Sequence, residues 1–149
     1  MSGLEIDFET RSPVDLRTRG VYVYFEHPET APLLASYRID GGPIRRWRPP
    51  APCPDDIVQH VTAGGIVSAH NAAFERLLWQ MILTPRYGWP PVRVEQFRCT
   101  AATAAALSLP RDLGGLALAL GLEQQKDKAG KRLIQVFSKP RKPRKGEVV

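Results

Sequence analysis

The fold is decided by Leu4-Glu5-Ile6-Asp7-Phe8-Glu9-Thr10. Apolar residues alternate there with acidic or polar ones, which is the period of a β-strand with one buried face. Side chains at i and i+2 of a strand share a face, so Asp7 and Glu9 point one way while Ile6 and Phe8 point into the core. Two adjacent carboxylates repel unless a cation lies between them, and Mg²⁺ prefers carboxylate oxygens. We therefore predict a cation site, with a solvated acidic edge strand as the alternative.

Three more strands are predicted close to the first one. Residues 21–25 are rich in β-branched and aromatic side chains, residues 33–39 form the next strand, and residues 44–47 form another after a turn at 40–43. Neighbouring strands joined by short turns pair antiparallel, so this half of the chain predicts an antiparallel sheet.

The second half alternates helices with strands. Helices are predicted at residues 55–62, 71–83, 100–107 and 113–120, strands at 66–69 and 92–99, and a weaker helical stretch at 130–137. Asp112 should cap the helix that Gly121 ends. The order predicts an α/β fold with a mixed sheet, three antiparallel strands followed by parallel strands, flanked by helices. One domain should cover residues 1–137, followed by a basic, disordered tail at 138–149.

Composition excludes several classes of protein. The chain has 149 residues, of which 43% are hydrophobic and 24% charged, as in globular domains. It shows neither a secretory signal pattern nor a membrane-spanning apolar run, so we expect a soluble, cytoplasmic protein without a membrane partner. Cys53 and Cys99 lack further Cys or His at ligand spacing, which argues against zinc and favours unpaired thiols.

Most of the net charge of +6 lies in the tail. Its cations are Lys139, Arg141, Lys142, Arg144 and Lys145, against Glu147. Such a run favours contact with a polyanion through counterion release. A solvated chain end is the alternative.

A second basic cluster surrounds an aromatic residue. Arg45, Arg46 and Arg48 flank Trp47, a combination that can hold a phosphate backbone and stack a base. The alternative is a surface hairpin with Trp47 packed on the sheet.

A third candidate lies where the strand at 66–69 meets the next helix. In the segment 68–75, SAHNAAFE, Asn71 should cap the helix, and Glu75 lies one turn later on the same face. Glu75 could then reach back toward the end of the sheet. The alternatives are an acid favoured by the helix dipole and a Phe74 that belongs to the core.

Together, the two acidic segments resemble a known family. D-F-E-T followed some sixty residues later by H-N-A-x-F-[D/E] resembles the first two motifs of the DEDD, or DnaQ-like, 3′–5′ exonucleases of the RNase H-like fold. The segments DFETRSPVDLRTRGVYVY, GGPIRRWRP, VSAHNAAFERLLW, FRCTAATAAALSLPRDLGGLALALGL and KDKAGKRLIQVFSKPRK resemble the exonuclease domains of phage-type family A DNA polymerases, in order and over nearly the whole chain.

This resemblance implies phosphodiester hydrolysis with two Mg²⁺ or Mn²⁺ ions, releasing nucleotides from a DNA 3′ end. Asp7 would bridge the metals, Glu9 would bind one and orient the attacking water, and Glu75 would supply the acid of the second motif. The resemblance implies that Thr10 and Phe74 lie near the terminal nucleotide. It also implies that Asn71 supports the geometry of the loop. Implied partners are single-stranded DNA, or a DNA 3′ end, and the rest of a DNA polymerase or another replication protein. The implied location is the cytoplasm of a bacterial host or phage-infected cell.

The chain departs from the family in two ways. Glu75 stands where the family usually has Asp, and the third motif, a Tyr or His four residues before a final Asp, is missing. Since catalytic groups of this kind fail as a unit, we expect weak or no hydrolysis by the isolated chain. Two further interpretations are a catalytically dead module for binding nucleic acid or protein, and a different RNase H-like nuclease whose final acid comes from another chain.

Overall fold

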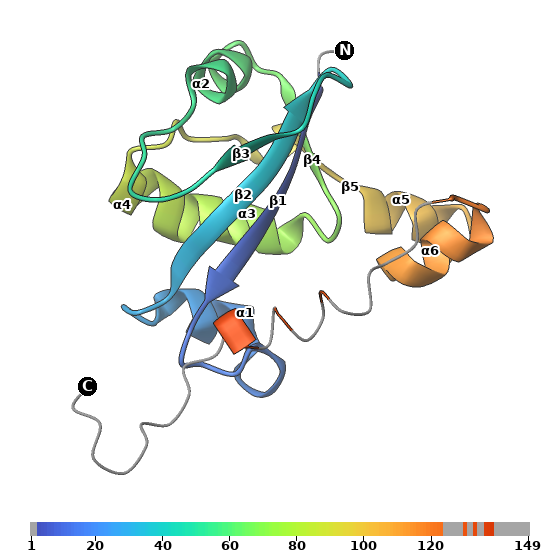
Figure 1. Cartoon of the computed structure of the whole chain (residues 1–149), viewed down its shortest axis with the longest axis horizontal. Helices are drawn as coiled ribbons and strands as arrows, with labels where there is room; N and C mark the ends of the chain where they lie inside the picture. The colour runs from blue at the N-terminus through green and yellow to red at the C-terminus, as the bar shows by residue number, and fades with distance from the viewer. Residues whose placement is uncertain (1–2, 124–129, 131–132, 134–135, 139–149) are drawn as a thin grey trace.

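A mixed five-stranded sheet forms the centre of the molecule (Figure 1). The computed structural model describes residues 3–123, 130, 133 and 136–138. The strands are β1 (Gly3–Arg11), β2 (Ala31–Ile39), β3 (Arg45–Trp47), β4 (Ile66–Ala69) and β5 (Phe97–Cys99), in the spatial order β3-β2-β1-β4-β5. The β3, β2 and β1 strands pair antiparallel, whereas β4 runs parallel to β1 and β5 runs parallel to β4.

Helices flank this sheet. They are α1 (Leu16–Glu26), α2 (Asp55–Thr62), α3 (Ala73–Leu78), α4 (Thr84–Tyr87), α5 (Thr100–Ala106) and α6 (Leu113–Ala119). The α/β class and the change from antiparallel to parallel pairing are confirmed, and both are consistent with an RNase H-like fold.

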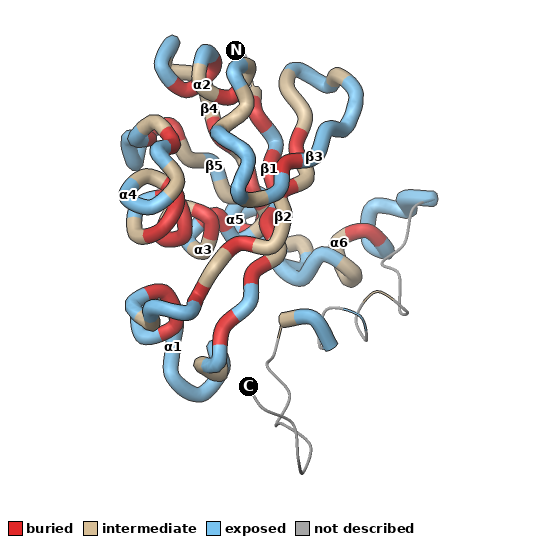
Figure 2. The backbone as a smooth tube through the Cα atoms, turned by 60° about the vertical axis from the view of Figure 1, so that its left-hand side comes forward, coloured by how far each residue is buried: buried red, intermediate tan, exposed pale blue. Residues whose placement is uncertain are grey.

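The two faces of the sheet differ in burial (Figure 2). Leu4, Ile6 and Phe8 of β1 are almost fully buried, and the Phe8 ring packs edge-on against Trp79. The residues between them point to the other face, where Glu5 and Asp7 are exposed. One face of β1 therefore builds the core, and the other presents acids to solvent.

The strand predicted at residues 21–25 is wrong, because these residues belong to α1. The Asp15 side chain caps α1 by accepting from the backbone N–H groups of Arg17 and Thr18, and the helix bends at Gly20, where φ is 79°. Tyr24 and Phe25 are then buried. The β-branched composition favoured a strand, but a local cap and tertiary packing outweigh that preference.

The helix predicted at residues 71–83 has different ends. It begins at Ala73, because Asn71 adopts a left-handed conformation with φ of 66°, so the cap assigned to Asn71 is wrong. After α3, the chain forms a wide π-helical turn at Trp79–Leu83 and continues directly into α4, which ends at Gly88. Pro85 lacks an N–H, and the wider turn lets the helix pass it.

The remaining predictions concern ends and tails. The strand predicted at residues 92–99 is reduced to β5, because Val94–Gln96 form a single helical turn. The Asp112 cap of α6 is confirmed, and both cysteines are unpaired. Residues 139–149, with the basic tail, lie outside the described residues. Within the described part of the chain, no helix is long and apolar enough to cross a bilayer.

Candidate functional site

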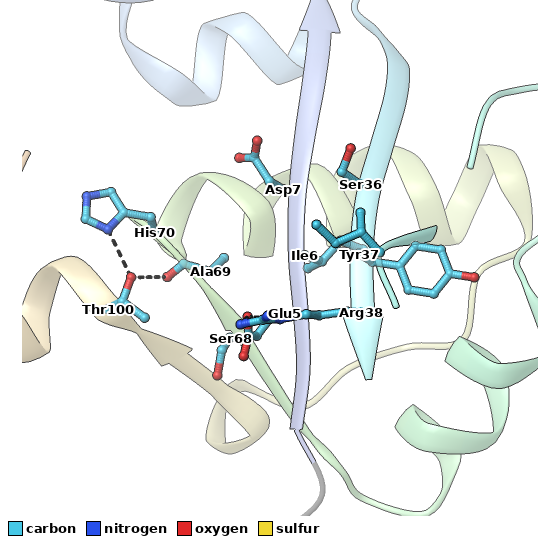
Figure 3. A pocket seen from close by; sticks show the side chains of 11 residues that line it. Glu5, Ile6, Asp7, Ser36, Tyr37, Arg38, Ser68, Ala69, His70 and Thr100 are labelled. Carbon is cyan, nitrogen blue, oxygen red and sulfur yellow. Dashed lines mark hydrogen bonds and ion pairs between the residues drawn. The ribbon is translucent and has the colours of Figure 1, made fainter. Parts of the chain in front are cut away.

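The acids of β1 lie on the exposed face of the sheet. Asp7 pairs with Ser36 of β2 and Glu9 pairs with Leu34. The alternation of buried and exposed residues continues through Arg11, so both carboxylates share one face as predicted. A cavity of about 320 Å³ lies beside Asp7, and Figure 3 shows Ser36 next to it on β2.

Glu75 lies on α3, close enough to Asp7 for the charge of Asp7 to affect it. The turn between β4 and α3 reverses at Asn71, whose carbonyl accepts from the N–H of Phe74. Glu75 then lies in the first turn of α3, with only 4% of its surface exposed. Its Oε2 atom has no hydrogen-bond partner among the described residues. A buried carboxylate oxygen without a partner is costly, so this atom is open to a proton or a cation.

The three carboxyl groups affect one another's ionisation. Burial raises the pKa of Glu75 from 4.5 to about 8, a backbone hydrogen bond opposes the rise, and the charge of Asp7 adds to it. Burial also raises the pKa of Asp7, against the opposing influence of His70, and burial followed by the charge of Asp7 raises the pKa of Glu9. Asp7 thus acts on both of the other acids, and a cation among them would favour their charged forms.

The donor chemistry suits a hard cation, but the described residues do not form a ready cage. Carboxylate oxygens are the ligands that Mg²⁺ and Mn²⁺ prefer, and the unpartnered Oε2 atom of Glu75 is such an oxygen. Among the described residues, however, no group of three His, Cys, Asp or Glu side chains is gathered closely enough to hold a metal. The charge of Asp7 acts on Glu9 and on Glu75, and binding of a metal at these acids stays a prediction.

His70 connects the site to the last helices. Its Nε2 atom lies 2.8 Å from the carbonyl oxygen of Arg111, and its Nδ1 atom lies 2.9 Å from Oγ1 of Thr100. A carbonyl oxygen only accepts, so Nε2 carries a proton and donates. Figure 3 shows His70 and Thr100 at the cavity beside Asp7. The turn after β4 is thereby tied to the start of α5 and to the residues before α6.

The predicted substrate contacts have packing partners. Thr10 is 7% exposed, and its hydroxyl lies 2.7 Å from the phenol oxygen of Tyr24 in a buried hydrogen bond. Phe74 is half-buried and packs on Tyr24 and Phe25. Contacts of Thr10, Phe74 and Asn71 with a nucleotide stay predictions. Tyr24 was missed, because residues 21–25 were assigned to a strand and not to a helix facing Thr10.

The four residues of the basic hairpin differ in their surroundings. Trp47 is 3% exposed, packs against Trp89, and donates from Nε1 to the carbonyl oxygens of the following loop. Trp47 is therefore packed on the sheet, as the alternative interpretation of this hairpin has it, and contact of the hairpin with nucleic acid stays a prediction. Arg45 forms an ion pair with Asp56, whereas Arg46 and Arg48 are exposed.

Comparison with known proteins places the chain near a phage replication enzyme. No family model matches the chain. It is 40% identical, over 97% of its length, to the DNA polymerase of Bacillus phage SP02. The chain spans 22% of the length of that polymerase, so it corresponds to a limited part of the phage protein. Its sequence is therefore related to a region of a phage DNA polymerase.

Proposed function

We propose that the chain is a 3′–5′ exonuclease-type domain of a phage-type DNA polymerase, acting on DNA through metal-dependent phosphodiester hydrolysis. The observation that carries this proposal is that Asp7 and Glu9 share the face of β1 that points away from the core, while the buried Glu75 of α3 keeps an oxygen without a hydrogen-bond partner among the described residues. The relation to a phage DNA polymerase supports the same assignment.

Each acid would have its own role at the metals. The charge of Asp7 acts on both other acids, and Asp7 would supply carboxylate oxygens to the metals. Glu9 would bind one metal and orient water, and Glu75 would complete the oxygen donors from α3. The metals, when bound, supply charge that stabilises the attacking and leaving oxygens. His70 would keep the turn after β4 in place beside Asp7 through its two hydrogen bonds.

Hydrolysis by the isolated chain should be weak or absent. The family's third motif contributes an acid and a Tyr or His, and this sequence offers no matching pair downstream of Glu75. The loss of one member of a catalytic set removes most of the rate that the whole set provides.

The test uses the full chain with Mn²⁺ or Mg²⁺ in two measurements. Calorimetric titration should detect Mn²⁺ binding that Asp7→Asn weakens strongly, while the conservative change leaves the fold intact. A labelled single strand should release nucleotides slowly or not at all, and only with metal. Absence of Mn²⁺ binding in the wild-type chain would refute the proposed site, and fast nucleotide release would refute the predicted weakness.

A second candidate function is a module that binds other macromolecules without hydrolysis. Leucines on and around α6 favour it, because they are exposed although apolar: Leu113, Leu118, Leu120 and Leu122 are all at least 51% exposed. Exposed apolar side chains such as these can take part in contacts with another macromolecule. Asp7→Asn separates the candidates, since binding by such a module should not respond to the loss of that carboxylate.

A further inference from the structure

The exposed face of the sheet carries a row of polar residues across three strands. Asp7 of β1 is paired with Ser36 of β2, and Ser36 is paired with Arg46 of β3. Residues paired across neighbouring strands share a face, so the three side chains project to the same side. Neighbouring strands lie about 4.8 Å apart, which puts Arg46 roughly 10 Å from Asp7 across the sheet.

Glu9 of β1 also has an arginine across the sheet. Glu9 is paired with Leu34, and both line a hollow of about 670 Å³ together with Arg48, whose other wall is formed by Leu133 and Phe137 near the end of the described chain. Arg48 directly follows β3, two residues after Arg46, which is the spacing of side chains on one face. Asp7 and Glu9 therefore each have an arginine at the far side of β2, whereas Glu5 pairs with Arg38 of β2 itself.

Arg46 and Arg48 differ from Arg45, the first residue of β3. Arg45 points to the opposite face and pairs with Asp56, which also accepts from the hydroxyl of Tyr37. Arg46 and Arg48 are exposed, and neither forms an ion pair with any described residue. Within the described part of the chain, their charges are therefore not neutralised by an acid.

We propose that the phosphate backbone of a single-stranded nucleic acid crosses the exposed face of the sheet and contacts Arg46 and Arg48 after passing Asp7 and Glu9. This inference rests on the proposed function, because that function places the strand's end at the acids. Guanidinium groups bind phosphate through paired hydrogen bonds. Two residues along a strand span about 6.8 Å, so the two arginines can contact different phosphates of the strand and need not share one.

Charge favours a nucleic acid here over a protein segment. A polyanion that approaches Asp7 and Glu9 is repelled by their carboxylates, and the arginines offset this repulsion without entering the acidic site. Arg38 cannot serve in this way, because it is paired with Glu5 at 2.6 Å. The face thus combines an acidic row for a cation with a basic edge for phosphates.

The experiment measures binding of a short oligothymidylate, labelled with fluorescein at its 5′ end, by fluorescence anisotropy. The full chain is titrated in EDTA at several salt concentrations, which keeps the oligonucleotide intact. The variants are Arg46→Gln, Arg48→Gln and the double variant. Arg45→Gln is the matched control, since it removes the same charge from the same hairpin but from the opposite face. The tail is present in every variant, so its contribution is constant.

Removing one arginine from the phosphate backbone should reduce the salt slope of the binding constant by about 0.7, which corresponds to a decrease of about fivefold in affinity near 0.1 M salt. The double variant should bind about 25-fold more weakly on the same basis, and Arg45→Gln should bind like the wild type. Unchanged affinity in the double variant would overturn the proposal and leave the face to a polypeptide partner. An equal decrease in Arg45→Gln would also overturn it, because the effect would then reflect net charge alone.

Failure of the inference can be told apart from failure of the proposed function. If Asp7→Asn leaves Mn²⁺ binding unchanged while Arg46→Gln and Arg48→Gln weaken oligonucleotide binding, the metal site fails and the strand path stands. If Asp7→Asn abolishes Mn²⁺ binding while both arginine variants bind normally, the strand path alone is wrong.

Discussion

The buried carboxyl of Glu75 should make the stability of the fold fall as pH rises. Its pKa is about 8 in the folded chain and 4.5 when the group is solvated, as in the unfolded chain. Below pH 4.5 both states hold the proton, so the group has no effect there. Between pH 4.5 and 8 the unfolded state releases the proton while the folded state keeps it, so stability is lost through this window and the loss is complete above pH 8.

The size of the effect follows from the two pKa values. At about 1.4 kcal/mol for each pH unit between 4.5 and 8, the loss has an upper limit of about 5 kcal/mol. That amount is comparable to the whole stability of a small domain. Glu75→Gln keeps the shape of the side chain but cannot ionise, so the variant should be more stable than the wild type at pH 8 and similar to it at pH 4.5.

The assay is urea unfolding of both proteins between pH 4 and 9, followed by circular dichroism. The difference in unfolding free energy between Glu75→Gln and the wild type should grow with pH and level off above pH 8. The difference at pH 4, where residue 75 is uncharged in the folded state of both proteins, serves as the internal control. A constant difference between Glu75→Gln and the wild type across the pH range would refute the reasoning. Mn²⁺ added at pH 8 should stabilise the wild type more than the variant, since a cation favours the charged carboxylate.

Two further substitutions test the packing around the site. Tyr24→Phe leaves the buried hydroxyl of Thr10 without this partner, so unfolding should become easier by about 1–3 kcal/mol in urea titrations; an unchanged midpoint would show that the hydrogen bond adds nothing. Gly65→Ala would put a Cβ atom 2.3 Å from the His60 ring, so the ring must move, at a cost of about 1–3 kcal/mol. Gly3→Ala, which has open space around the new carbon, should melt like the wild type, and equal losses in both variants would contradict the steric argument.

Much of the fold follows from local sequence patterns. The alternation around Asp7 predicts β1, and residues 55–62 are assigned to a helix that the structure places at Asp55–Thr62. These elements were predictable because their pattern and their end signals agree. Residues 21–25 were not, because strand-forming side chains there follow the Asp15 cap, and a helix buries Tyr24 and Phe25 against Phe74. Contacts between distant segments decide such a case, and the local composition does not show them.

The sequence predicts which residues belong to the candidate site, but it does not predict their burial or the pKa of Glu75. Strand periodicity alone puts Asp7 and Glu9 on one face, and the structure confirms that arrangement. The burial of Glu75 depends on the helices and strands that pack around α3, so its raised pKa could not be read from the sequence. In the same way, only the register of β3 shows that Arg46 faces the acids while Arg45 faces Asp56.

The two faces of β1 have different roles: one is part of the buried core, and the other carries the acids. Leu4, Ile6 and Phe8 supply the burial that holds the sheet to the helices, so substitutions there should act on stability. Asp7 and Glu9 lie outside the buried face of β1. Burial raises the pKa of both side chains, and the charge of Asp7 adds to the rise at Glu9, so their charged forms are unfavourable in the folded chain. Glu75 keeps a buried oxygen without a hydrogen-bond partner among the described residues, which packing alone does not require. Under the proposed function, a cation beside Asp7 would favour the charged forms of these carboxylates.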